Sequence, residues 1–135
     1  MLDSMTDRLM GNETQNGTAK LFVKIGTHLS VVSIANIVYI QASGDYIDIT
    51  LATGEVLHSK NKITHFEDRL PKNLFVRIHR SLVLNKQHIR EIKAKQNSYE
   101  FTLTNDVAVV SGPTYRKYIR ELFFLNLAKD SEPNN

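Results

Sequence analysis

One stretch of the chain brings cations, a hydroxyl and an amide together in an order that suits the binding of an anion. It runs from Phe75 to Asn85 and begins as a strand, with Val76 and Ile78 on one face. Arg80 and Ser81 follow where that strand should end. A guanidinium can donate two hydrogen bonds to guanine O6 and N7, whereas hydroxyls and amides suit phosphate oxygens. The stretch therefore predicts an anion-binding loop at a strand end.

Two other polar segments interrupt the predicted strands, so that the chain offers three candidate contact loops. We name residues 43–46 the first loop, residues 79–81 the second loop and residues 111–114 the third loop. The third loop also opens a predicted helix, whose N-terminal amides and dipole favour an anion. The candidate contacts in and beside the loops carry polar or cationic groups: Asp45, Tyr46, Arg80, Ser81, Asn85, Lys86, Thr114, Arg116 and Lys117.

Each candidate also has a purely structural alternative. Arg80 could pair with a surface carboxylate, and Tyr46 could pack on the sheet. Asn85 could cap a turn through its own backbone, and Ser111 with Thr114 could cap the helix. For Asn85 and Ser111 we favour the structural alternative, because such caps and turns are common.

Positive charge is concentrated around the second loop. From Arg77 to Lys95 there are six basic residues and one acid, Glu91, an excess that is larger than the net charge of +3 of the whole chain. A local excess of this kind is typical of a polyanion site, and it is also typical of a solvated lysine-rich face.

Composition and motifs argue against catalysis and against a metal or cofactor. The chain has 135 residues and no cysteine, which excludes disulfides and thiolate zinc sites and fits a reducing cytoplasm. No export signal is expected at its start, and no apolar run approaches the ~20 residues of a membrane span. It contains no phosphate-binding glycine loop and no nucleophile elbow. Its five histidines are scattered, and His79 is interpreted as a hydrogen-bonded structural residue because it lies inside a strand.

The pattern of the chain predicts one all-β domain with two helices. We expect a flexible polar tail or linker at residues 1–19, the domain at 20–127 and a polar C-terminal tail at 128–135. Short apolar runs, separated by turn signals every eight to twelve residues or so, are typical of an all-β domain. The strands are expected at residues 21–25, 28–33, 34–40, 46–51, 56–58, 75–79, 88–94 and 99–103, with a last buried strand at 107–110.

Helical spacing occurs in two places. Ile63, Phe66 and Leu70 share one helix face, and Asn61 or Ser59 is expected to cap the start of that short helix. A closing helix is expected from Thr114, with an apolar stripe made of Tyr115, Tyr118, Ile119, Leu122 and Leu125 or Asn126.

At residues 75–85 the chain resembles the LytTR family of bacterial DNA-binding output domains. The family pattern is an aromatic, a hydrophobic residue, Arg, a hydrophobic residue, His, Arg or Asn, Ser, and then Val-Asn two or three residues later. The chain matches it, with Leu84 between Val83 and Asn85. Further similarity lies at residues 37–46, 89–92 and 111–117, so the resemblance covers about residues 20–125.

The resemblance implies an elongated set of small antiparallel sheets with one short internal helix and a C-terminal helix. It places Tyr46, Arg80 and Thr114 in the three contact loops, which enter successive major grooves. It also implies that Ser81 and Lys117 bind phosphate groups. Many members carry a basic residue directly after the Ser or Gly of the third loop, where this chain has Pro113. Arg80 is therefore expected to be the main direct base contact.

The resemblance also implies a function and partners. We expect sequence-specific binding of double-stranded promoter DNA in bacterial transcription regulation, with repeated half-sites, a homodimer on DNA and an upstream sensor kinase or membrane partner as family expectations. Most members carry a receiver domain before this part, and about twenty residues precede it here. The alternative function is a small all-β protein-interaction module whose exposed strand edges dock a partner.

Overall fold

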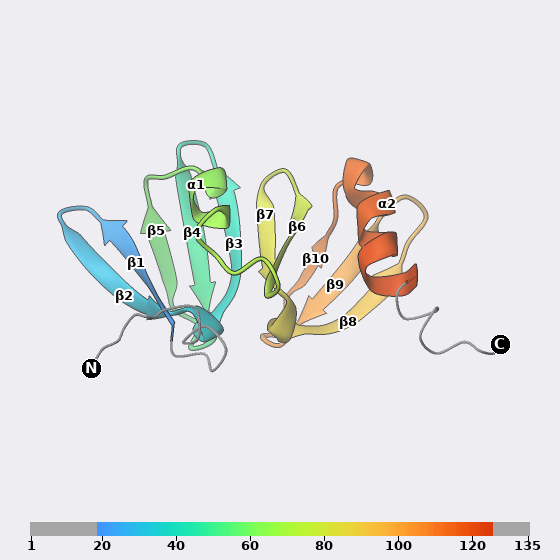
Figure 1. Cartoon of the computed structure of the whole chain (residues 1–135), viewed down its shortest axis with the longest axis horizontal. Coiled ribbons are helices and arrows are strands. Elements are labelled where there is room, and N and C mark those ends of the chain that lie inside the picture. Colours follow the sequence, from blue (N-terminus) through green and yellow to red (C-terminus); the bar gives the residue numbers. More distant parts are fainter. Residues whose placement is uncertain (1–18, 126–135) are drawn as a thin grey trace.

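The computed structural model describes residues 19–125 and shows an elongated molecule built from three antiparallel sheets (Figure 1). The expected all-β class is confirmed. The predicted tails, residues 1–18 and 126–135, lie outside the described residues. Ala19, assigned to the N-terminal tail, packs against the core, and its carbonyl accepts a hydrogen bond of 3.0 Å from the amide of Ile34.

The first sheet is a hairpin of β1 (Lys20–Ile25) and β2 (His28–Ser33). The central sheet has five strands in the order β5-β4-β3-β7-β6. These strands are β3 (Ile37–Ser43), β4 (Tyr46–Leu51), β5 (Val56–Ser59), β6 (Phe75–His79) and β7 (Leu82–Asn85). The third sheet has the order β10-β9-β8, made of β8 (Ile89–Ala94), β9 (Tyr99–Leu103) and β10 (Ala108–Val110).

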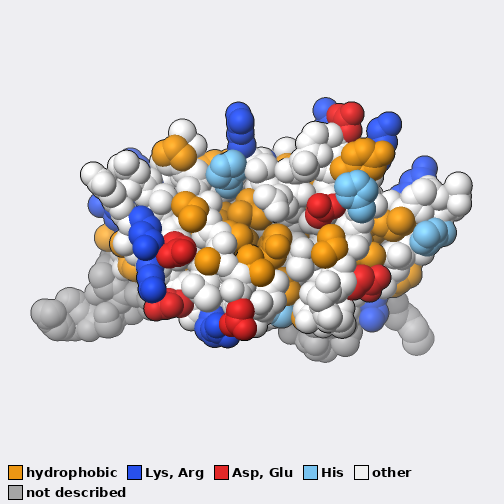
Figure 2. All heavy atoms as spheres, turned by 180° about the vertical axis from the view of Figure 1, so that it is seen from behind, with side chains coloured by type: hydrophobic (Ala, Val, Ile, Leu, Met, Phe, Trp, Pro, Cys, Tyr) orange, Lys and Arg blue, Asp and Glu red, His pale blue; other side chains and the backbone are white. Residues whose placement is uncertain are grey.

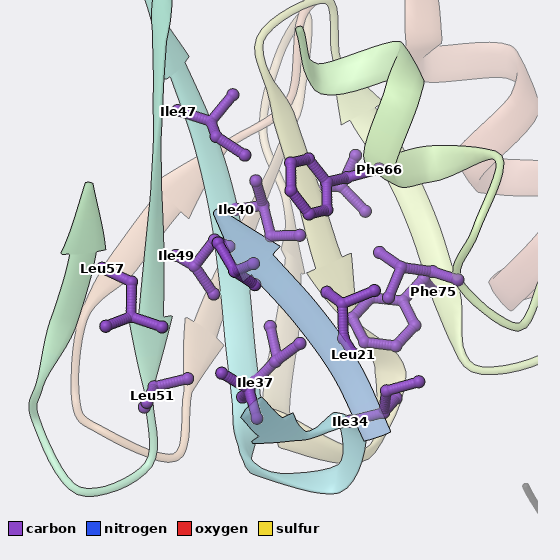
Figure 3. Packing of buried hydrophobic residues seen from close by; sticks show 14 of the residues in the cluster. Leu21, Ile34, Ile37, Ile40, Ile47, Ile49, Leu51, Leu57, Phe66 and Phe75 are labelled. Carbon is purple, nitrogen blue, oxygen red and sulfur yellow. The ribbon is translucent and has the colours of Figure 1, made fainter. Parts of the chain in front are cut away.

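The central sheet is covered on both faces where β3, β7 and β6 lie, as the side chains of β6 show. Phe75 packs into a cluster with β1, β2 and α1 (Ile63–Glu67), as Figure 3 shows for Leu21 and Phe66. Val76 and Ile78 belong to a second cluster with the three-stranded sheet and the C-terminal helix. The predicted common face of Val76 and Ile78 is therefore confirmed. The opposite face was expected to carry Phe75, Arg77 and His79, but a register shift between Arg77 and His79 pairs His79 with Leu82 of the second cluster, so His79 lies on the face of Val76 and Ile78.

Two local predictions near the first sheet and α1 need correction. Residues Ile34–Asn36 form a short 3-10 turn, η2, so β3 begins later than expected. Lys62 precedes α1 and makes no side-chain cap. The hydroxyl of Ser59, one of the two expected caps, donates instead to the carbonyl of Lys24 at 2.7 Å and ties β5 to β1.

The closing helix is irregular, and this changes its buried face. It comprises a 3-10 turn, η4 (Pro113–Tyr115), then α2 (Arg116–Ile119) and a π-helical segment, η5 (Arg120–Leu125). Ile119 is buried as expected, but Tyr118 is 48% exposed and Leu125 is 44% exposed. Phe123 and Phe124 pack on the core in their place. The wider π turns rotate the apolar face, which a stripe drawn at 3.6 residues per turn misses.

The last strand was expected to be buried, and the structure places it at an edge. β10 pairs only with β9 among the described strands, and Val110 is 51% exposed. A run of small apolar residues does not by itself distinguish a covered strand from an edge strand.

A candidate nucleic-acid interface

The three predicted loops lie along one long edge of the molecule. In Figure 1 the β3–β4 turn, the β6–β7 turn and the start of η4 all point to the upper edge. The amide of Ala42 donates to the carbonyl of Ser81 at 2.9 Å, and the amide of Gly112 donates to the carbonyl of Ile78 at 2.9 Å. These backbone hydrogen bonds bring together three segments that are far apart in the sequence. Seen from behind, Lys and Arg side chains project from this edge, and hydrophobic side chains gather over the middle of the face (Figure 2).

The second loop is held in place by Arg77. Its guanidinium forms an ion pair with Glu67 of α1 (Nη1 to Oε1, 2.5 Å) and donates from Nε to the carbonyl of His79 at 2.9 Å. Its remaining nitrogen, Nη2, donates to the carbonyl of Arg80. The Arg77 side chain is only 18% exposed, so these bonds are largely shielded from water. They fix the backbone from which Arg80 projects.

Arg80 itself is exposed, and none of the ion pairs among residues 19–125 involves it. The adjacent Ser81 is half-buried, and both its amide and its hydroxyl contact Nδ1 of His79, at 3.1 and 3.0 Å. His79 is thus the hydrogen-bonded structural residue that the sequence predicted. The second loop presents one free guanidinium on a rigid turn.

The third loop packs closely on the second. A Cβ atom at Gly112 would lie 3.2 Å from Cδ2 of His79, closer than ordinary packing allows. The hydroxyl of Ser111 is buried and accepts a hydrogen bond of 2.9 Å from the amide of Tyr99, so it braces β9 and does not cap the helix. Pro113 and Thr114 are exposed. Thr114 therefore remains available at the edge.

The first loop is a tight turn that presents Asp45 and Tyr46. Gly44 has a φ of 60°, a left-handed conformation that glycine adopts without steric cost. Asp45 is exposed, and Tyr46 is 39% exposed. The ring of Tyr46 stacks on the imidazole of His58, with centroids 4.4 Å apart and planes 11° from parallel. Tyr46 therefore packs on a neighbouring side chain as well as facing the edge.

The expectation that Asn85 and Lys86 add to the second loop is corrected by the structure. Strand β7, which ends at Asn85, leads away from the second loop, and at about 3.3 Å per residue it carries the chain to the opposite edge. Asn85 is fully buried: its Nδ2 donates to the carbonyl of Ile37 at 2.9 Å, and its Oδ1 accepts from the amide of Gln87 at 2.9 Å. Its structural alternative, the turn cap, is the one observed.

The two cations after the third loop differ in their surroundings. The guanidinium of Arg116 lies over the ring of Tyr99, with Cζ 4.9 Å from the centroid. It also donates to the Tyr99 hydroxyl at 3.3 Å and to the carbonyl of Lys95 at 3.2 Å. Arg116 thus packs on the third sheet, and its expected contact with DNA stays a prediction. Lys117 is exposed, and no ion pair within residues 19–125 involves it.

The basic excess of residues 77–95 does not mark the interface. Three of its six cations pair with acids from outside that segment: Arg77 with Glu67, Arg90 with Asp106, and Lys95 with Glu100. Those pairs neutralise three of the six cations, and among the cations that form no ion pair within residues 19–125, Arg80 is the one that lies in a contact loop. In the part of the chain that the structure describes, no group of three potential ligands could hold a metal ion. No helix there is both long and apolar enough to span a bilayer.

Three residues that hold the loops in place were not predicted from the sequence as site residues: Glu67, Arg77 and His58. Arg77 carried a usable signal, because a charged residue between buried strand positions requires a partner. The identity of that partner, ten positions away on α1, had no local signature. His58 had none either, since its stacking depends on the register of β4 with β5.

Replacing Asn85 with Ala is expected to lower the free energy of unfolding by about 1–3 kcal/mol, because the Ile37 carbonyl and the Gln87 amide lose their partner. Urea unfolding followed by circular dichroism measures this. Asn97→Ala, at an exposed turn position, is the matched control and should change the free energy by less than about 0.5 kcal/mol. Equal stability of the two variants would contradict the bridging role of Asn85.

Comparison with known proteins adds to the geometry. A family model for the LytTr DNA-binding domain matches residues 27–124. The chain belongs to this family. A solved LytTr DNA-binding domain of a response regulator from Bacillus cereus has a TM-score of 0.70 at 24% identity, covering 80% of this chain and 99% of that one. The LytTr fold is therefore shared.

Curated relatives of this LytTr domain are longer proteins. The Sensory transduction protein LytR of Staphylococcus saprophyticus is 24% identical over 128 residues, which are 92% of this chain and 50% of that protein. The Sensory transduction protein LytT of Bacillus subtilis is 26% identical over 110 residues, 81% of this chain and 45% of that protein. The chain spans about half the length of the curated relatives it matches.

Proposed function

We propose that this LytTr domain binds double-stranded DNA in a sequence-specific manner and regulates transcription in bacteria. The observation that carries the proposal is the single edge on which three loops meet, with an exposed Arg80 projecting from a turn braced by Arg77. Family membership supports DNA as the ligand and gives no support to catalysis. The loops would enter the major groove, where base edges are distinguishable.

The side chains divide by chemistry into base contacts and phosphate contacts. Arg80 would read a guanine through two parallel hydrogen bonds. Tyr46 and Thr114 would contact base edges from the first and third loops, beside Asp45. Ser81 and Lys117 would bind phosphate oxygens, which fix the register of the protein on the duplex.

Cellular partners follow from the same proposal. Curated relatives carry the names Sensory transduction protein and Transcriptional regulatory protein. We place this domain in the cytoplasm, bound to promoter DNA as a homodimer on repeated half-sites and controlled by an upstream sensor kinase. A chain with one small contact edge gains affinity and specificity when two copies occupy neighbouring sites.

Selection from a randomised duplex library tests the proposal, followed by binding of the selected duplex and a scrambled one at two salt concentrations. Two phosphate contacts in each of two copies predict that affinity falls roughly 150-fold when salt rises fourfold, because counterions are released on binding. An enriched motif with a clear specificity ratio is the expected result. Absence of binding at low salt would refute DNA binding, and salt-sensitive binding without a motif would refute sequence specificity.

A further inference from the structure

The first loop carries a side-chain arrangement that the proposed function has not used. His58 lies on β5 directly opposite Asp48 of β4 in the strand register, and Tyr46 lies two positions before Asp48 on the same strand. Nδ1 of His58 is 2.5 Å from Oδ1 of Asp48. The imidazole in turn stacks on the ring of Tyr46, at 4.4 Å and 11°. One carboxylate thus orients one imidazole, which covers one face of a tyrosine ring.

This arrangement lies on the surface, where stacking and a hydrogen bond are not needed to fill a core. The side chains of His58 and Asp48 are 60% and 41% exposed, and Tyr46 is 39% exposed. A hydrogen bond between exposed side chains contributes little to folding, so its main effect is on the direction of the rings. Because His58 covers one face, Tyr46 can offer only its other face and its hydroxyl edge to a ligand.

We propose that Asp48 and His58 are positioning residues that hold the ring of Tyr46 for DNA readout by the first loop, an inference that rests on the proposed DNA binding. The physical gain is pre-organisation. An unsupported tyrosine must be ordered when the duplex binds, and ordering one such side chain weakens binding by about two- to tenfold. Arg77 also pre-orders the second loop, but it does so by hydrogen bonds to backbone carbonyls. His58 instead contacts the ring that is proposed to bind DNA.

Double-variant binding to the selected duplex tests this role. His58→Ala is expected to weaken binding about two- to tenfold in the natural background and to have no effect in a Tyr46→Ala background. His58→Phe, which keeps a stacking ring, should recover most of the loss. Val56→Ala, an exposed position at the far end of β5, is the matched control and should bind like the natural protein.

A salt titration separates positioning from direct contact. The slope of log affinity against log salt should be unchanged in His58→Ala, because removal of a phosphate contact lowers it by about 0.9. Natural affinity in His58→Ala would overturn the proposal. An equal loss in the Tyr46→Ala background would also overturn it, since His58 would then contact DNA by itself.

NMR of the free protein provides a readout that does not depend on DNA. The ring protons of Tyr46 should shift in His58→Ala, because they lose the ring current of the stacked imidazole, and should stay unchanged in Val56→Ala. Unshifted ring protons in His58→Ala would overturn the proposal. If the stack is present in solution but the natural protein binds no duplex, the proposed DNA function fails and the readout role fails with it.

Discussion

Replacing Arg80 with Ala is expected to weaken binding to the preferred duplex by about 1–3 kcal/mol, roughly five- to 150-fold. Arg80 has no competing ion pair among residues 19–125, so its guanidinium is free to form two hydrogen bonds with one guanine. Loss of those bonds should also flatten the base preference at one position of the site. Titration of the natural duplex and three single-base variants measures both effects.

Arg90→Ala is the matched control for Arg80. It removes the same side chain from β8, where Arg90 pairs with Asp106 of the β9–β10 turn at the opposite edge of the molecule (Figure 1). We expect near-natural affinity and an unchanged base preference. If Arg80→Ala weakens every duplex by the same factor, Arg80 is a phosphate anchor and direct readout by it is wrong.

Replacing Arg77 with Ala is expected to reduce both stability and base preference. The variant leaves Glu67 and the carbonyls of His79 and Arg80 without their shared donor. We expect the free energy of unfolding to fall by about 2–4 kcal/mol, less than for a fully enclosed pair because the Glu67 side chain is 33% exposed. The base preference should flatten at the same position as in Arg80→Ala, since the turn that aims Arg80 loses its brace.

Urea unfolding and duplex titration below the transition measure these two effects separately. Lys95→Ala is the control, because the side chains of its 3.4 Å pair with Glu100 are 52% and 29% exposed and the pair should contribute no more than about 1 kcal/mol. A folded Arg77→Ala protein that reads the Arg80 position as sharply as the natural protein would refute the bracing role.

The parts of the fold that local pattern determines were predictable. Alternation at residues 46–51 and 75–79 predicted both strands, and it assigned the faces of β4 and of the first four residues of β6 correctly because the period of two depends on neighbouring residues alone. The register shift after Arg77, which turns His79 to the face of Val76 and Ile78, is not predicted by alternation. The placement of Arg80 and Thr114 at exposed turns was predictable for the same reason. The start of the strand predicted at residues 34–40 was wrong, because a short 3-10 turn and a strand can have the same apolar composition.

Features that depend on distant partners were beyond the sequence. Asn85 and Lys86 follow Arg80 closely in the chain, and only the length and direction of β7 carry them to the other edge. Three of the six cations near Arg77 are paired by Glu67, Glu100 and Asp106, which come from other parts of the chain. The buried face of the closing helix depends on the π-helical segment at its end, which its residue types do not predict.

The β6–β7 hairpin of the central sheet is covered on both faces, and this affects which part of the molecule opens most slowly. All four residues of β7 are buried, and β6 contributes side chains to both apolar clusters. Opening the β6–β7 hairpin would expose two interiors at once, so this hairpin belongs to the slowest-opening part of the domain. The turn that carries Arg80 therefore belongs to the part of the molecule that opens most slowly. Binding of a duplex would cost this turn little conformational entropy, because its backbone is already ordered.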